Sequence, residues 1–188
     1  MRTFRSKVDA VMVGAGTLRA ERLSLGLDEF SSVEKQPLAV VVTRTGDVPL
    51  ESDLVRQEGD PRALVLVPGW LAADIVARLR RHADFLRAPA TPLGAVDLGE
   101  AVSALQAERG VELLLVEGGP SLNHSAFSGS LADELFLTLA PKLLGRTTDE
   151  TLTVLEGPRL PAGEWADPDL LSAHVAGGEL FLRYRVGA

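Results

Sequence analysis

Four short apolar runs constrain the fold of this chain more than any other feature. They are VDAVMV (8–13), LAVVVT (38–43), ALVLVP (63–68) and VELLLVE (111–117). Each is rich in leucine or β-branched residues and alternates little between polar and apolar positions, which is typical of strands buried on both faces. Because stretches with helical spacing separate the runs, the sequence predicts an α/β fold with a mostly parallel central sheet and helices on both faces.

Two of the intervening stretches have clear helical patterns. WLAADIVARLRRH (70–82) repeats apolar residues at every fourth position. DLGEAVSALQAERG (97–110) also has end signals, because Asp97 and Glu100 have capping-box spacing and Gly110 is placed to end the helix. Both stretches are therefore predicted to be helices.

The C-terminal third follows a different pattern. ADELFLTLAPKLLG (132–145) and LLSAHVAGGELFLRYRVG (170–187) resemble strands with no helix between them, and Gly177-Gly178 is a two-residue hairpin turn. We expect these antiparallel strands to finish one edge of the sheet. Segment 145–167 is predicted to be a loop with one short extended piece, TLTVL.

Composition excludes several classes of function. The 188 residues suit one domain, 1–188, and a net charge of −7 argues against nucleic acid or an anionic membrane as partner. The chain has no cysteine and no apolar stretch of about 20 residues, so we expect a cytoplasmic protein without disulfides or thiolate metal sites. Its three histidines are scattered, and no metal site is expected.

The first strand end with chemical interest is VGAGTLRAE (13–21). Gly14 and Gly16 allow the backbone to approach a ligand, and Thr17 is placed to cap a following helix whose N–H groups favour an anion. Arg19 stands where a dinucleotide fingerprint has its third glycine, so the match to that motif fails. Taken alone, this loop is better explained by a simple strand-to-helix turn than by a ligand site, and Glu21 is either a solvated helix residue or part of the site.

The second strand end is VVTRTG (41–46). Thr43, Arg44 and Thr45 place a guanidinium between two hydroxyls, a combination that suits a phosphate monoester. The alternative is a solvated loop arginine with no ligand.

The third strand end is VEGGPSLNHS (116–125). Glu117 ends an apolar strand, Gly118-Gly119 follow it, and Pro120 opens a predicted helix. The first N–H groups of that helix suit a pyrophosphate, whereas a carboxylate at the strand tip accepts bonds from hydroxyls or a ring N–H. This order favours a site, because ligands bind at the carboxyl ends of strands in open α/β sheets.

The three loops resemble those of the RibD C-terminal family, the reductase domain of riboflavin biosynthesis. The resemblance rests on DAVMVGAGTLRAE (9–21), PLAVVVTRTGDVP (37–49), LLVEGGPSL (114–122), SLADELFLTLAPKLLG (130–145) and GGELFLRYR (177–185). It covers nearly the whole chain and implies a dihydrofolate-reductase-like, three-layer fold.

The resemblance also implies an activity, a cofactor and an assembly. Members are NADPH-dependent, usually homodimeric, and reduce the ribosyl group of 5-amino-6-(5-phosphoribosylamino)uracil to ribityl. Glu117 and Leu25 would lie on the substrate side, and Arg44 would meet the 2′-phosphate of the cofactor. The implied cofactor-binding residues are Gly14, Gly16, Thr17, Glu21, Thr43, Arg44, Gly118, Gly119, Pro120, Ser121, Leu122, Asn123 and Ser125.

Two departures from the family pattern keep alternatives open. The chain is expected to lack the family's first strand, which lies beside the strand ending at Glu117, and Asp28 stands where members carry an arginine for the substrate phosphate, with Arg22 nearby. The alternatives are a non-catalytic nucleotide-binding homologue and a related reductase of another pterin or imine substrate.

Overall fold

A computed structural model describes residues 2–21, 36–49, 63–143, 153–159 and 167–186. The chain divides into two compact units, Met1–Leu122 and Asn123–Ala188.

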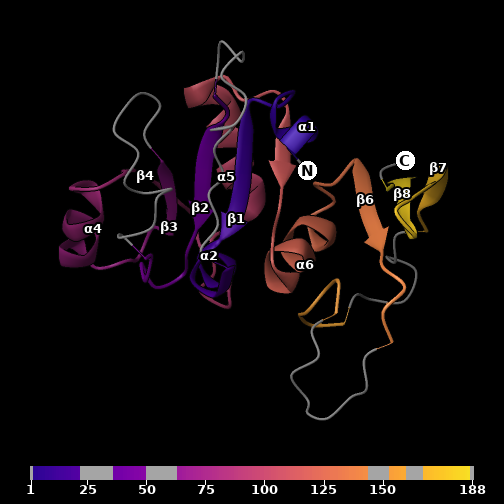
Figure 1. Ribbon diagram of the computed structural model, residues 1–188. Helices are drawn as coiled ribbons and strands as arrows, with labels where there is room; N and C mark the ends of the chain where they lie inside the picture. The colour runs from indigo at the N-terminus through magenta and orange to yellow at the C-terminus, as the bar shows by residue number, and fades with distance from the viewer. Residues whose placement is uncertain (1, 22–35, 50–62, 144–152, 160–166, 187–188) are drawn as a thin grey trace. The chain divides into compact units, whose positions relative to one another are not determined.

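The first unit contains a five-stranded sheet in the order β4-β3-β2-β1-β5, in which every neighbouring pair is parallel. Because the strands are parallel, their carboxyl ends meet at one edge of the sheet (Figure 1). The strands are β1 (Ala10–Gly14), β2 (Leu38–Val42), β3 (Leu64–Pro68), β4 (Asp84–Ala88) and β5 (Leu114–Val116).

The four predicted apolar runs are confirmed as β1, β2, β3 and β5, each somewhat shorter than its run. Strand β4 escaped prediction because its sequence, DFLRA, carries Asp84 and Arg87 within five residues. It lies at the end of the sheet order, where one edge has no neighbouring strand among the described residues, and such positions tolerate charge.

Helices cover both faces of this sheet. They are α2 (Ala15–Glu21), α4 (Ala73–Arg80) and α5 (Leu98–Arg109), with a four-residue α1 (Arg2–Arg5) before β1. Val11, Val41 and Val65 point to one face, where they form a buried cluster with Leu18 of α2 and Leu79 of α4. The alternate residues of the same strands are also buried, and α5 packs against β4 (Figure 1). Burial on both faces explains the unbroken apolar runs.

The end signals predicted for α5 are confirmed. The Asp97 side chain accepts hydrogen bonds from the backbone N–H groups of Gly99 and Glu100. Gly110 ends the helix in the left-handed conformation, at φ 65°. These caps place the start of β5, where the Asp9 carboxylate accepts bonds from two further backbone N–H groups, those of Glu112 and Leu113.

The second unit contains an antiparallel sheet in the order β6-β8-β7. Its strands are β6 (Glu134–Leu139), β7 (Asp169–Ala176) and β8 (Glu179–Arg185). The predicted hairpin is confirmed, because Gly177 and Gly178 join β7 to β8 with φ of 59° and 80°.

The expectation that these strands finish an edge of the parallel sheet was wrong, since they form a sheet of their own. The hairpin turn brings β8 beside β7 and, among the described residues, β6 pairs with the other edge of β8, so the three strands bond one another's backbone groups. The predicted extended piece TLTVL forms no strand at 153–155, and its first two residues lie outside the described part. Within the described residues, no helix has the length and apolar character needed to cross a membrane.

Candidate functional site

Helix α2 connects the three strand-end loops that the sequence singled out. It follows β1 directly, and Figure 1 shows it at the tip of that strand. One of its side chains reaches the loop after β5, and another reaches the loop after β2, as described below. The three loops therefore lie together at the carboxyl edge of the sheet, as predicted for a ligand site in an open α/β fold.

Thr17 and Gly119 form the first of these connections. A Cβ atom built on Gly119 would lie 2.6 Å from the Thr17 hydroxyl oxygen, so only glycine fits at this position without movement. The prediction that Thr17 caps its helix was wrong, because α2 begins at Ala15 and Thr17 lies in its first turn. The hydroxyl instead lies against the Gly-Gly backbone that precedes α6 (Pro120–Ser128).

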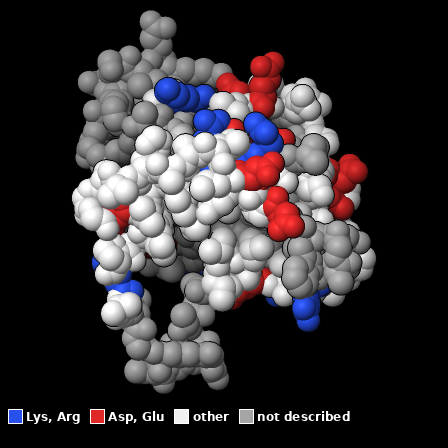
Figure 2. All heavy atoms as spheres, turned by 90° about the vertical axis from the view of Figure 1, so that its right-hand side faces the viewer, with Lys and Arg blue, Asp and Glu red and all other residues white. Residues whose placement is uncertain are grey.

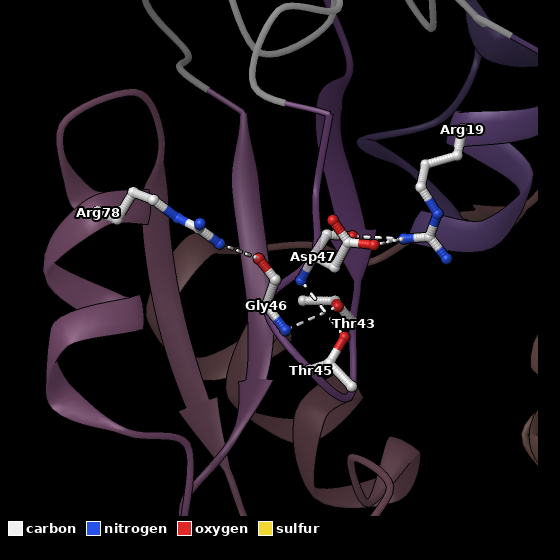
Figure 3. A network of polar contacts seen from close by, with 6 residues as sticks. All are labelled: Arg19, Thr43, Thr45, Gly46, Asp47 and Arg78. Carbon is white, nitrogen blue, oxygen red and sulfur yellow. Dashed lines mark hydrogen bonds and ion pairs between the residues drawn. The ribbon is translucent and has the colours of Figure 1, made fainter.

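Arg19 and Asp47 form the second connection (Figure 3). The Arg19 guanidinium donates to the backbone carbonyl of Asp47 and lies 3.2 Å from its carboxylate. Both side chains are substantially exposed, so the ion pair adds little stability, although it ties α2 to the loop after β2.

The loop after β2 is held in one conformation by its own hydroxyls (Figure 3). Thr43 is buried and its hydroxyl accepts the Gly46 N–H at 3.1 Å, while the Thr45 hydroxyl accepts the Asp47 N–H at 3.4 Å. Gly46 has φ 73°, and a Cβ atom there would lie 2.4 Å from Ile75. This packing turns Arg44 outward, where its side chain is exposed.

The remaining residues of the first loop have room beside them. Among the described residues, a Cβ atom on Gly14 would meet no atom within 4 Å, and one on Gly16 would meet only the Arg19 guanidinium, at 3.8 Å. Glu21 is exposed at the end of α2. The structure therefore contains the strand-to-helix turn and also leaves open space beside Gly14, so both interpretations of this loop remain compatible with it.

Glu117 is held by a residue that the sequence did not single out. Arg5 of α1 donates from Nε to one carboxylate oxygen at 2.7 Å and from Nη2 to the other at 2.5 Å. Both side chains are buried, with 11% and 8% exposed, and the carboxylate raises the pKa of Arg5 above its ordinary value. The bidentate bond fixes the Glu117 carboxylate at the tip of β5.

A signal for Arg5 did exist in the sequence. It was an arginine three residues before the first apolar run, VDAVMV (8–13). Because Arg5 and Glu117 are 112 positions apart, no local pattern joins them.

Helix α6 begins at Pro120, as predicted, with Leu122 and Ala126 buried. Further along the same helix, Asn123 donates to the carbonyl of Val154, and a ring nitrogen of His124 lies 2.6 Å from the carbonyl of Pro158. Segment 153–159 is thereby attached to α6. Of the other predicted residues on this helix, Ser121 is exposed and Ser125 half-buried.

Three residues of the sequence prediction lie outside the described part of the chain. They are Leu25, proposed for the substrate side, and the neighbouring Arg22 and Asp28.

Comparison with known proteins identifies the family that this chain resembles. A family model described as the RibD C-terminal domain matches residues 1–167. The chain is 29% identical over 187 residues to the 2,5-diamino-6-ribosylamino-4(3H)-pyrimidinone 5′-phosphate reductase of Methanothermobacter thermautotrophicus, covering 97% of this chain and 82% of that one. It is 30% identical to the protein of the same name from Archaeoglobus fulgidus, covering 79% and 69%.

Among solved structures, form 2 of RibD from Acinetobacter baumannii has the same fold. It superposes with a TM-score of 0.75 at 21% identity, covering 98% of this chain. This chain spans about half of that longer protein, 48% of its length.

Proposed function

Because the chain belongs to the RibD C-terminal domain family, we propose that it is an NADPH-dependent reductase of riboflavin biosynthesis. The substrate class is a ribosylaminopyrimidine 5′-phosphate, whose ribosyl group is reduced to ribityl. The candidates are 5-amino-6-(5-phosphoribosylamino)uracil and the 2,5-diamino-6-ribosylamino-4(3H)-pyrimidinone 5′-phosphate for which the two relatives are named. Residues 1–188 are proposed to act as one reductase domain.

The observation that carries this proposal is the joining of three strand-end loops by α2. Thr17 packs against Gly119, and Arg19 bonds the loop that carries Arg44. A dinucleotide is long and carries a pyrophosphate between two ribosyl groups, so it needs several loops at one sheet edge. Loops that follow β1, β2 and β5 meet this requirement.

The residues present fit NADPH at three points. The Gly118-Gly119 backbone and the first turn of α6 suit the pyrophosphate, because helix N-termini favour anions. The open space beside Gly14 leaves room for the cofactor against the end of β1. The exposed Arg44, next to the fixed hydroxyls of Thr43 and Thr45, suits the 2′-phosphate. Glu21, Pro120, Ser121, Leu122, Asn123 and Ser125 complete the proposed cofactor side.

Bound NADPH supplies the hydride, so the protein's own task is to orient donor and acceptor and to exclude water. On the substrate side, Glu117 is proposed to accept hydrogen bonds from the ligand. Arg5 holds that carboxylate ionised and in one orientation, because it bonds both oxygens.

Cofactor titration followed by turnover tests this function. We expect NADPH to raise the melting temperature of the protein and to be oxidised in the presence of one of the two phosphorylated substrates. No thermal response at millimolar NADPH would refute the cofactor assignment. Binding of NADPH without its oxidation by either substrate would support the non-catalytic homologue instead, and oxidation with a pterin alone would support the other reductase.

We also propose a homodimer formed through the second sheet. The residues on one of its faces are all apolar, by the register of the three strands: Leu135, Leu137, Leu139, Leu170, Ala173, Val175, Leu180, Leu182 and Tyr184. Val175, Leu170 and Leu139 are 77%, 56% and 55% exposed.

Figure 2 shows acidic, basic and uncharged residues on one side of the molecule, with uncharged residues covering much of the view. A continuous apolar sheet face of this kind is typical of a subunit interface. Analytical ultracentrifugation is expected to show a dimer that Val175→Lys dissociates. A monomer at all concentrations would refute this interface.

A further inference from the structure

A hollow of about 290 Å³ lies between α4 and β4, and the proposed reductase site uses none of its lining residues. Its apolar part consists of Ala73, Val76 and Ala77 of α4 and Phe85 of β4. Strand β4 stands at the opposite end of the sheet order from β5, so the hollow is well separated from Glu117 (Figure 1).

The hollow follows from the local sequence of both elements. On α4, Val76 and Leu79 face the core, whereas Ala73 and Ala77 leave only methyl groups on the side that lines the hollow. Phe85 and Arg87 alternate with the buried Leu86 and therefore share one side of β4. Because β4 ends the sheet, no further strand among the described residues fills the space beside it.

Three guanidinium groups line the same hollow. The Arg80 guanidinium lies 5.0 Å from the centre of the Phe85 ring. Arg87 donates to the backbone carbonyls of Gly69 and Leu71, which uses two of its five N–H donors. Within the described part of the chain, neither Arg80 nor Arg81 forms an ion pair. In a protein with net charge −7, this is a local concentration of positive charge.

A purely structural explanation accounts for part of this arrangement. Arg80 lies in the last turn of α4, where a cation favours the negative end of the helix dipole, and its stem covers the Phe85 ring. The bonds of Arg87 to the carbonyls of Gly69 and Leu71 give that side chain a structural role as well. Neither explanation accounts for the apolar hollow that the three side chains surround.

We propose that this hollow is a second ligand site, which binds a small planar aromatic anion. One face of the ligand ring would lie on Val76, Ala77 and the edge of Phe85, beside the stacked Arg80 guanidinium, and its carboxylate or phosphate would take bonds from Arg80 and Arg81. The guanidinium already stacked on Phe85 extends the flat surface to a ring system. A volume near the lower end of small-molecule sites suits one ring or two fused rings.

The probe for this site is 1-naphthyl phosphate, compared with neutral 1-naphthol and with inorganic phosphate. Protein NMR titration is expected to show saturable shifts confined to residues 73–87. We expect affinity at least about tenfold better than either half of the probe, because ring and anion contribute together. Saturating NADPH should leave the titration unchanged, so this result does not depend on the reductase function.

The test variants are Arg80→Ala/Arg81→Ala and Phe85→Leu. Both arginines are exposed, so the double variant should fold, and leucine retains the apolar wall while removing the ring face. Each variant is expected to weaken the probe about tenfold or more. Arg109→Ala is the matched control, since Arg109 also ends a helix but lines no part of the hollow, and it should bind the probe normally.

Three results would overturn the proposal. The first is the absence of a saturable shift at probe concentrations on the order of 10 mM, because a specific site for a ligand of this size binds more tightly than that. The second is a shift centred on the Thr17 and Gly119 loops that NADPH abolishes. The third is equal weakening by Arg109→Ala and by the double variant, which would indicate only a general charge effect.

Discussion

Replacing Arg5 with methionine would test how the Glu117 carboxylate is held. Methionine keeps an unbranched apolar stem in place of the arginine stem but leaves Glu117 buried without its bidentate partner. Two unit charges about 4 Å apart attract by about 4 kcal/mol at an effective dielectric constant near 20. Removing one member of a buried pair typically costs about 3–5 kcal/mol, because the other charge stays desolvated.

The expected loss of unfolding free energy is large because the hydrogen bonds are short and both side chains are buried. Nε and Nη2 of Arg5 bond the two carboxylate oxygens at 2.7 and 2.5 Å, and the two side chains are 11% and 8% exposed. For a chain of this length, a loss of about 3–5 kcal/mol lowers the melting temperature by about 6–20 °C. Glu117→Gln should cost a similar amount, because it strands the Arg5 cation.

Urea denaturation of Arg5→Met, of Glu117→Leu and of Arg5→Met/Glu117→Leu completes a double-mutant cycle. The double variant is expected to be more stable than either single variant, since an apolar pair avoids both desolvation costs. Arg109→Met is the control, because its bond to Asp84 is 3.5 Å long and about 40% exposed, and it should cost less than about 1 kcal/mol. A cost below about 1 kcal/mol for Arg5→Met, or a double variant that loses the sum of both singles, would refute this reasoning.

The remaining predictions address the loops and the second sheet. Gly119→Ala should lower the melting temperature by about 2–12 °C, because the added Cβ would lie 2.6 Å from the Thr17 hydroxyl oxygen. Thr17→Ala in the same chain should restore most of that loss, and a double variant as unstable as Gly119→Ala alone would contradict this contact. Arg44→Ala should weaken NADPH about tenfold and NADH hardly at all, as measured by fluorescence titration, and equal losses would remove the 2′-phosphate role. Arg183 bonds Glu134 and holds the pKa of that carboxyl below 4.5, so the small stabilisation from this exposed pair should be present above pH 4.5 and lost as the pH falls further. A melting-temperature difference between wild type and Glu134→Gln that persists at low pH would contradict this sign.

Much of the fold could be predicted because its signals are local. The runs that became β1, β2, β3 and β5 are apolar throughout, since both faces of the sheet are covered. The caps of α5 and the Gly177-Gly178 turn depend on residues a few positions apart. Strand β4 escaped because charge on an edge strand erases the pattern that buried strands show.

In the candidate site, too, the features with local sequence signals could be predicted and the long-range contacts could not. The sequence by itself determined which loops follow parallel strands. Apolar runs separated by helical stretches predict the parallel strands, and the glycines that follow those runs mark the loops. Only the tertiary structure decided that Thr17 lies against Gly119, that Arg19 ties the Arg44 loop to α2, and that Arg5 holds Glu117. These contacts join side chains up to 112 positions apart. Their geometry depends on how the helices pack on the sheet, and no short pattern of residues encodes that packing.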